Sequence, residues 1–349
     1  MSKRTLTLIA LFVSLIFFSG CQYGHGINNG EKKETSLKNL AKKKHIYIGT
    51  AVRDYAIKRD PNYSKLIAHE FNSITPENEM KFSVVHPGKY YYNFSDADNL
   101  VDYAKLNNLV VRGHTLVWDK RIPAWLQNGN FTKDEMEQIL KGHIETVVGH
   151  FKGKVYAWDV VNEAFNGDGS LKDSIWLRTI GPEYIQLAFQ WAHEADTKAL
   201  LFYNDYSIET VNSKSNAVYN MVKDFKRKGI QIDGVGFQTH TGIYSGLNLE
   251  SMEQNMDRFG KINVKVNITE LDIGILGNEP IRARQKKQAQ MYGNIMKTCL
   301  KSSACSSFTM WGVTDKYTWR PDNDAPLIFD KNFRKKEAYW SLFKNLNSW

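Results

Sequence analysis

Two glutamates, Glu163 and Glu270, each lie in a run of polar residues that follows an apolar stretch. A pair of carboxyl groups can divide acid–base work, because one donates a proton while the other, ionised, attacks or activates water. Such a pair can cleave a glycosidic bond if burial and a negative neighbour raise the pKa of the proton donor. A single strand-end glutamate is more often part of an ordinary ion pair, so the catalytic interpretation depends on the pair.

Short apolar stretches that alternate with helical patterns must position these glutamates. The predicted strands are 45–52, 71–75, 109–118, 155–161, 199–204, 232–240, 264–271 and 306–311. The predicted helices are 132–150, one starting at Pro182, 217–228, 252–259, 282–300 and 335–346. Eight strands alternating with helices predict an α/β protein with a single (β/α)8 TIM barrel. The alternative is an open, doubly wound sheet, whose glycine-rich phosphate-binding signature is missing from the chain.

In a TIM barrel the functional side chains lie at the C-terminal ends of the strands, and most predicted strands here end in polar or aromatic residues. Side chains alternate along a strand, so Gln238 and His240 are expected on one face. Asn162 and Glu163 are neighbours. Both can therefore face one cleft only if their strand ends or bulges there.

The composition excludes several classes of protein. Hydrophobic residues make up 42% and charged residues 24%, which is ordinary for a soluble globular chain and excludes a disordered or multi-span membrane protein. The net charge of +9 suits either a polyanionic partner or a basic linker with a basic surface. Many of the excess lysines lie in 21–44 without interleaved aromatic residues, which favours the linker and predicts no nucleic-acid partner. The chain lacks a P-loop, a His-Glu-x-x-His motif and paired Cys-x-x-Cys motifs, so no metal site is predicted.

The first residues have the features of a bacterial export signal. A positive start is followed by an apolar segment, 6–18, that is too short to span a bilayer. The sequence before Cys21 resembles a lipobox, which predicts a signal peptide over 1–20 and a lipid on Cys21. We therefore expect a flexible basic linker over 21–44, the barrel over 45–349, and an exported lipoprotein anchored at the outer membrane or cell surface. The alternative is plain cleavage near Ser19 and a secreted or periplasmic protein.

Seven motifs follow one another along the chain: Thr75-Pro76-Glu77-Asn78-x-Met80-Lys81, Arg112-Gly113-His114-Thr115-Leu116-x-Trp118, Trp158-Asp159-Val160-Val161-Asn162-Glu163-Ala164, Tyr203-Asn204-Asp205-Tyr206, Gly236-x-Gln238-x-His240, Ile268-Thr269-Glu270-Leu271-Asp272 and Trp311-Gly312-Val313-x-Asp315-x-Tyr317-x-Trp319-Arg320. Through them, residues 45–349 resemble glycoside hydrolase family 10, the endo-β-1,4-xylanases. The resemblance implies a TIM barrel, retaining endo-hydrolysis of β-1,4-xylosidic bonds in xylan or xylo-oligosaccharides, and no required cofactor.

The resemblance also implies a role for each matching residue. Glu163 matches the acid/base and Glu270 the nucleophile. His240 matches the histidine that orients the nucleophile, Asn162 the contact to the sugar 2-hydroxyl, and Gln238 a neighbour of the acid/base. Asp272 belongs to the same supporting set. The implied substrate-binding residues are Glu77, Asn78, Lys81, His114, Trp118, Tyr206, Trp311 and Trp319.

The chain departs from the family pattern beside Trp118. Asp119-Lys120-Arg121 replaces the usual His-Ser-Gln, Phe82 stands where tryptophan is common, and Ser207 where asparagine is common. These changes leave open the preference among plain xylan, acid-decorated xylan and other β-1,4-glycans. Arg121 either pairs with Asp119 or faces the groove, where it would meet a glucuronic acid branch.

Some family members carry a cysteine pair before the eighth strand. By that resemblance, and because an exported compartment is oxidising, Cys299 and Cys305 are predicted to form a disulfide. The alternative is two free, buried thiols.

Two other functions remain in competition at this stage. One is a related retaining β-1,4-glycanase or a transglycosylase on the same barrel. The other is a non-catalytic glycan-binding lipoprotein on a degenerate barrel, which the presence of both Glu163 and Glu270 disfavours.

Overall fold

The computed structural model describes residues 35–348, and Thr35 opens a single folded unit. Its strands are β1 (Tyr47–Val52), β2 (Ser73–Pro76), β3 (Val110–Val117), β4 (Ala157–Asn162), β5 (Leu200–Asp205), β6 (Gly234–Phe237), β7 (His240–Gly242), β8 (Lys265–Gly274) and β9 (Cys305–Met310). All pair in parallel. Strands β1 to β6 follow one another, β6 pairs with β8, and β9 joins β8 to β1, which closes an eight-stranded barrel. Strand β7 adds only a short ladder beside the end of β8.

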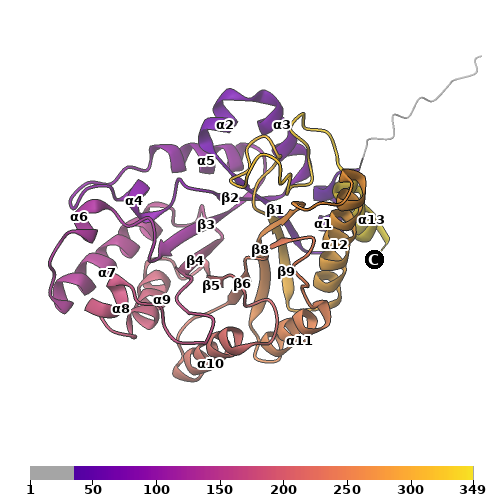
Figure 1. Cartoon of the computed structure of the whole chain (residues 1–349). Helices are drawn as coiled ribbons and strands as arrows, with labels where there is room; N and C mark the ends of the chain where they lie inside the picture. The colour runs from indigo at the N-terminus through magenta and orange to yellow at the C-terminus, as the bar shows by residue number, and fades with distance from the viewer. Residues whose placement is uncertain (1–34, 349) are drawn as a thin grey trace, which may run out of the picture. The chain divides into compact units, whose positions relative to one another are not determined.

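Helices surround the strands at the centre of Figure 1. They are α1 (Leu37–Lys43), α2 (Asp54–Arg59), α3 (Pro61–Glu70), α4 (Phe82–Val85), α5 (Ser95–Leu106), α6 (Ala124–Gln127), α7 (Lys133–His150), α8 (Ile175–Thr179), α9 (Tyr184–Ala195), α10 (Ser213–Lys228), α11 (Leu249–Gly260), α12 (Ile281–Lys301) and α13 (Glu337–Ser348). The predicted TIM barrel is thus confirmed. No helix among residues 35–348 is long and apolar enough to cross a membrane.

Local sequence signals set several helix ends. Thr132 and Glu135 form a capping box at the start of α7, at the residue where the predicted helix 132–150 begins. Gly229 ends α10 with a φ of 70°, a left-handed conformation that glycine adopts without steric cost. These ends fix where the loops between strand and helix begin.

The N-terminal boundary of the barrel differs from the prediction. Helix α1 lies within the stretch 21–44 that was expected to be linker, and its Leu37, Leu40 and Ala41 are buried. The side chain of Ser36 caps the helix by accepting a hydrogen bond from the Asn39 amide. Three apolar residues at helical spacing therefore fold onto the barrel in spite of the lysines between them. The predicted signal peptide and Cys21 lie outside the described residues.

Two strand ends are irregular, and both position polar side chains. Strand β4 shifts its register against β5 between Asp159 and Val161, and Glu163 follows the strand with a φ of 57°. This is the bulge and strand end that allow two neighbours to face one cleft. The predicted strand 232–240 is wrong in its last residues, because it breaks after Phe237, where Thr239 has a φ of 62°.

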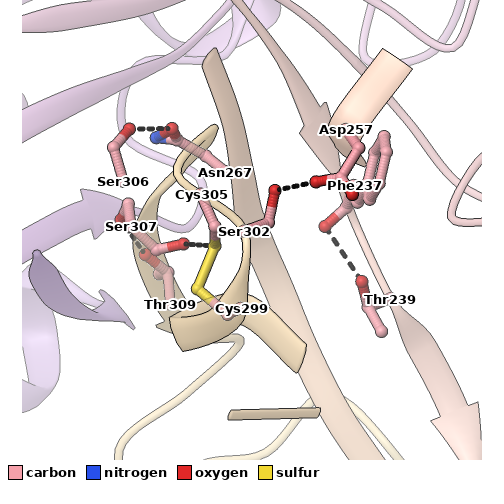
Figure 2. Close-up of a disulfide and its surroundings, with 10 residues drawn as sticks. All are labelled: Phe237, Thr239, Asp257, Asn267, Cys299, Ser302, Cys305, Ser306, Ser307 and Thr309. Atoms are coloured by element: carbon pink, nitrogen blue, oxygen red, sulfur yellow. Dashed lines mark hydrogen bonds between the residues drawn. A yellow bond between two sulfur atoms is a disulfide. The ribbon is translucent and has the colours of Figure 1, made fainter. Parts of the chain in front are cut away.

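A disulfide joins the end of α12 to the start of β9 (Figure 2). Cys299 and Cys305 are bonded as predicted, both are buried, and the Cys305 sulfur lies 3.8 Å from the Ser307 carbonyl oxygen. Near it, Ser302 donates a hydrogen bond to Asp257 of α11, and Ser306 donates one to Asn267 of β8. The bond therefore fixes the connection that enters the last strand of the barrel.

Candidate active site

A cleft of about 420 Å³ lies at the C-terminal ends of the barrel strands. Both Glu163 and Glu270 line it, and each is more than nine-tenths buried. The other lining residues are Glu77, Asn78, Lys81, His114, Trp118, Lys120, Asn162, Tyr206, Ser207, Gln238, His240, Trp311 and Trp319. Every predicted catalytic, supporting and substrate-binding residue is therefore brought to one cleft except Asp272, which lies directly behind His240.

The carboxylate of Glu163 has a different environment at each oxygen. Oε1 accepts a hydrogen bond of 3.1 Å from the Gln238 amide. Oε2 accepts no hydrogen bond from the described residues, and the ammonium groups of Lys120 and Lys172 each lie 3.5 Å from it. The backbone N–H of Glu163 donates to the Asn204 carbonyl, which fixes the residue in its left-handed conformation.

The pKa of Glu163 is shifted opposite to the sequence-based expectation. Burial alone raises it, but the Gln238 hydrogen bond, the charges of Lys120 and Lys172 and the nearby Trp118 indole N–H together lower it below its ordinary value. These neighbours therefore favour the ionised form of Glu163. To act as a proton donor, Glu163 must first gain a proton, and it can do so when bound substrate displaces or screens Gln238, Lys120 and Lys172.

Both carboxyl oxygens of Glu270 lie within hydrogen-bond distance of fixed side chains. Its Oε1 accepts a hydrogen bond of 2.7 Å from the Asn204 amide, and its Oε2 lies 3.1 Å from His240 Nε2. The other ring nitrogen of His240 lies 3.0 Å from Asp272. Burial opposes charge on this imidazole, but hydrogen bonds to Asp272 and Glu270 raise the pKa of His240 to about 10. His240 is thus a cation at neutral pH, and it stabilises the negative charge on Glu270.

A chain of amide side chains joins the two glutamates. Gln238 donates to Glu163 and to Asn162 Oδ1, and Asn204 donates to the same Asn162 oxygen and to Glu270. The Asn204 amide has one orientation, because Thr269 donates a hydrogen bond to its oxygen and leaves its NH₂ group for the two acceptors. The relative position of the two carboxyl groups is therefore fixed by the protein.

On the side of β1 and β2, the cleft is lined by Glu77, Asn78 and Lys81, and an ion pair holds Glu77 in place. Arg53 makes two contacts of 2.7 Å to the two oxygens of Glu77, a bidentate geometry that fixes this carboxylate. Lys81 Nζ lies 3.4 Å from Asn78 Oδ1 and 5.3 Å from the centre of the Trp118 ring. Burial lowers the pKa of Lys81, against the opposing charges of Glu270 and Glu77. These groups are arranged to bind hydroxyls.

Aromatic rings form the remaining walls. Trp311 packs edge-on against His114, with 5.2 Å between ring centres, and Trp319 packs against His240 at the same distance. The Trp319 indole N–H donates to Asp272, which leaves its ring half exposed at the rim. Flat rings beside fixed polar groups can bind the C–H faces and the hydroxyls of sugars.

Comparison with known proteins agrees with this geometry. The sequence matches the profile of glycosyl hydrolase family 10 over residues 36–345. The chain belongs to this family. It is 42% identical to an endo-1,4-beta-xylanase B from Thermotoga neapolitana over 94% of this chain and 95% of the relative. It is also 40% identical to a beta-1,4-xylanase from Dictyoglomus thermophilum, over 99% of this chain and all of that protein.

Solved structures show the same family fold. The structure is similar to xylanase 10B from Thermotoga petrophila RKU-1, which was solved in complex with xylobiose, with a TM-score of 0.87 and 44% identity. The match covers 89% of this chain and 97% of the other. Xylanase 10B from Thermotoga maritima matches with the same TM-score and identity, and over 98% of its length.

The departures from the family-10 pattern now have places in the structure. Arg121 forms no ion pair with Asp119 among the described residues, so the first of the two alternatives for Arg121, pairing with Asp119, is wrong. Arg121 has a φ of 58°, and this turn ends the strand alternation that would have placed the two side chains together. Phe82 stacks on His143 at 3.6 Å between ring centres, so it lies in the core rather than in the cleft.

Four residues of the site were assigned no role from the sequence. Two of them hold predicted site residues in place: Arg53 binds Glu77, and Asn204 binds Glu270. The other two, Lys120 and Lys172, face the Glu163 carboxylate. Asn204 and Lys120 lay in or beside the quoted motifs, so their positions carried a signal. Arg53 and Lys172 carried none, because a charged residue in a loop is ordinarily solvated.

Proposed function

We propose that this family-10 protein is a retaining endo-β-1,4-xylanase with Glu163 as acid/base and Glu270 as nucleophile. The observation that supports this assignment most is the asymmetry of the two carboxylates. The His240 cation and the Asn204 amide bind Glu270, whereas Glu163 has one oxygen without a hydrogen-bond partner. The endoxylanase names of the relatives support the substrate class.

In the first step, ionised Glu270 attacks the anomeric carbon, and Glu163 donates its proton to the departing glycosidic oxygen. The product is a glycosyl ester on Glu270 and a shortened chain with a new hydroxyl. Esterification removes the negative charge of Glu270, which makes Glu163 more acidic. Glu163 then takes a proton from water, the water oxygen attacks the anomeric carbon, and Glu270 leaves as a carboxylate with configuration retained.

The polar and aromatic walls supply substrate binding. Glu77, Asn78 and Lys81 are proposed to bind the hydroxyls of a sugar one unit toward the non-reducing end, which fits the similar structure that contains xylobiose. Asn162 is proposed to contact the 2-hydroxyl of the sugar at the cleavage point. Hydrogen bonds there that strengthen in the transition state increase kcat.

We also propose that the chain is exported as a lipoprotein with lipid on Cys21. The support is the sequence alone: a positive start, a short apolar segment and small residues before the cysteine. A tether between Cys21 and the barrel would hold the enzyme at a membrane surface while the cleft acts on polymer.

The direct test compares reducing-sugar release and viscosity loss on xylan and on mixed-linkage β-glucan. An endoxylanase lowers the viscosity of xylan early and acts weakly on the glucan. Equal rates on both polymers would indicate a broader β-glycanase, and binding of xylan without sugar release would indicate a glycan-binding protein. The Glu270→Ala variant should bind xylan and release almost no sugar.

A further inference from the structure

A small cavity lies beside the proposed acid/base and next to the main cleft, with which it shares Trp118, Asn162 and Glu163. Its lining includes Trp118, Asp119, Glu163, Lys172 and Tyr184, and about 10 Å³ of it is open to the centre of a water-sized sphere. This is the volume that one water molecule needs, and it is too small for a sugar. The Trp176 indole closes one wall, where it donates a hydrogen bond to the Trp118 carbonyl.

Three buried polar atoms of the residues around this cavity make no well-aligned hydrogen bond to the described residues, although the Trp118 indole lies close enough to Glu163 to lower its pKa. They are Trp118 Nε1, Asp119 Oδ1 and Glu163 Oε2, one donor and two acceptors. A buried polar atom without a hydrogen bond costs about 1–3 kcal/mol, so three in one place point to a shared partner. One water can satisfy all three, since it accepts from the indole N–H and donates to the two carboxylates.

We propose that Asp119 is a positioning residue for the acid/base: it shares one bound water with Glu163 Oε2 and keeps a proton on this pair of carboxyl groups. The proposal depends on the assignment of Glu163 as acid/base. The family pattern has histidine at position 119. The proposal gives the aspartate found there in this chain a defined role in the reaction.

The charges around Glu163 show why such a residue is needed. Lys120 and Lys172 each lie 3.5 Å from Oε2, and both favour the ionised form of Glu163, which cannot protonate a leaving group. Asp119 opposes them with a like charge. Burial and the charge of Glu163 raise the pKa of Asp119, while Lys172 and Lys120 lower it, and the net shift is upward.

Groups from the other elements complete this electrostatic environment. Burial, and after it the negative charge of Asp119, raise the pKa of the Tyr184 hydroxyl on α9. Asp205 at the end of β5 acts on both Tyr184 and Lys172. Gln238 is neutral and donates to the other oxygen of Glu163. Asp119 is therefore the carboxylate that lines the same small cavity as Glu163. Two such carboxyl groups take up their first proton as a pair, at a higher pH than Glu163 would alone.

The test compares the pH profiles of kcat/KM on xylotetraose for wild type, Asp119→Asn, Lys120→Met and the double variant. Loss of the Asp119 charge should move the alkaline limb down by about one pH unit, and loss of the Lys120 charge should move it up by a similar amount. The double variant, with no net change in charge, should return close to wild type. Asp322→Asn is the control, because this exposed carboxylate pairs with Lys331 and not with the cleft.

A second substrate separates proton donation from folding or binding. An aryl xylobioside with a strongly acidic leaving group needs no proton from Glu163 in the first step. Asp119→Asn should therefore lose at least about fivefold on xylotetraose above neutral pH and keep the wild-type rate of aryl release. A limb that stays in place or moves up in Asp119→Asn would overturn the proposal, as would equal losses on both substrates.

Two further variants keep the experiment decisive. Glu163→Gln should abolish the alkaline limb on xylotetraose, and a limb that persists would refute the acid/base assignment rather than the role of Asp119. If Asp119→Asn does not fold, Asp119→Glu and Lys120→Met carry the test. An unchanged limb in Lys120→Met would then contradict the charge balance on which the proposal depends.

Discussion

His240 links the stability of the barrel to pH in a way that can be measured directly. Its ring nitrogens lie 3.1 Å from Glu270 and 3.0 Å from Asp272, and these carboxylates raise the pKa of His240 from 6.5 to about 10. In the unfolded chain the imidazole loses its proton near pH 6.5. Between these two values the folded protein therefore binds one more proton than the unfolded protein.

The sign and size of the effect follow from this difference. The contribution of His240 is fully present below about pH 6.5 and is lost as the pH rises through about 10, since stability falls wherever the folded state binds more protons. The full shift corresponds to about 4–5 kcal/mol. The side chain is 21% exposed, and solvent screening reduces the expected value to about 2–3 kcal/mol.

The assay is guanidinium unfolding followed by tryptophan fluorescence for wild type and His240→Asn at about pH 6, 8 and 10. The difference in unfolding free energy between the two proteins should be largest at the lowest pH and shrink by about 2–3 kcal/mol toward the highest. His45→Asn is the matched control, because His45 is exposed and asparagine tolerates its left-handed backbone. A difference between wild type and His240→Asn that is constant across pH would refute the inference that His240 is a cation in the fold.

Three more predictions concern the disulfide, the N-terminus and the ion pair between Arg53 and Glu77 in the cleft. Replacing Cys299 and Cys305 by serine should lower the free energy of unfolding by about 2 kcal/mol, the loop-closure value for so short a loop, and unchanged denaturation curves would contradict this. Cys21→Ser should move the enzyme from the membrane fraction to the soluble fraction at equal specific activity, and unchanged fractionation would show that Cys21 carries no anchor. Arg53→Met should raise KM for xylotriose about tenfold with little change in kcat, because it frees Glu77 from its bidentate pair, and a fall in kcat alone would show that Arg53 acts on the chemistry instead.

The fold could be predicted because its signals are periodic and local. Apolar strands that end in polar residues give the barrel and the face that carries the site, and a capping box or a terminal glycine marks individual helices. Helix α1 was missed because its three apolar residues are separated by lysines, and the burial of Leu37, Leu40 and Ala41 becomes visible only when the barrel is present. Helix α5 was missed although Ala97, Leu100, Val101 and Ala104 have helical spacing.

Only those site residues that belong to recognisable sequence motifs could be predicted. The fourteen residues that the motifs indicated meet at one cleft or directly behind it. Their partners depend on contacts between distant segments, such as Arg53 with Glu77 and Asn204 with Glu270, which no local pattern encodes. The direction of the pKa shift of Glu163 was wrong for the same reason, because it depends on where Lys120 and Lys172 come to lie.

The roles of the two glutamates can be separated by azide rescue of alanine variants acting on an aryl xylobioside with a good leaving group. In Glu163→Ala the glycosyl ester on Glu270 still forms, and azide attacks it from the face opposite Glu270 to give a β-glycosyl azide. In Glu270→Ala azide takes the place of the missing nucleophile and gives an α-glycosyl azide. Proton NMR of the anomeric position distinguishes the two products. The assignment of Glu163 as acid/base and Glu270 as nucleophile predicts β for the first variant and α for the second, and the reverse pattern, or the same anomer from both, would contradict it.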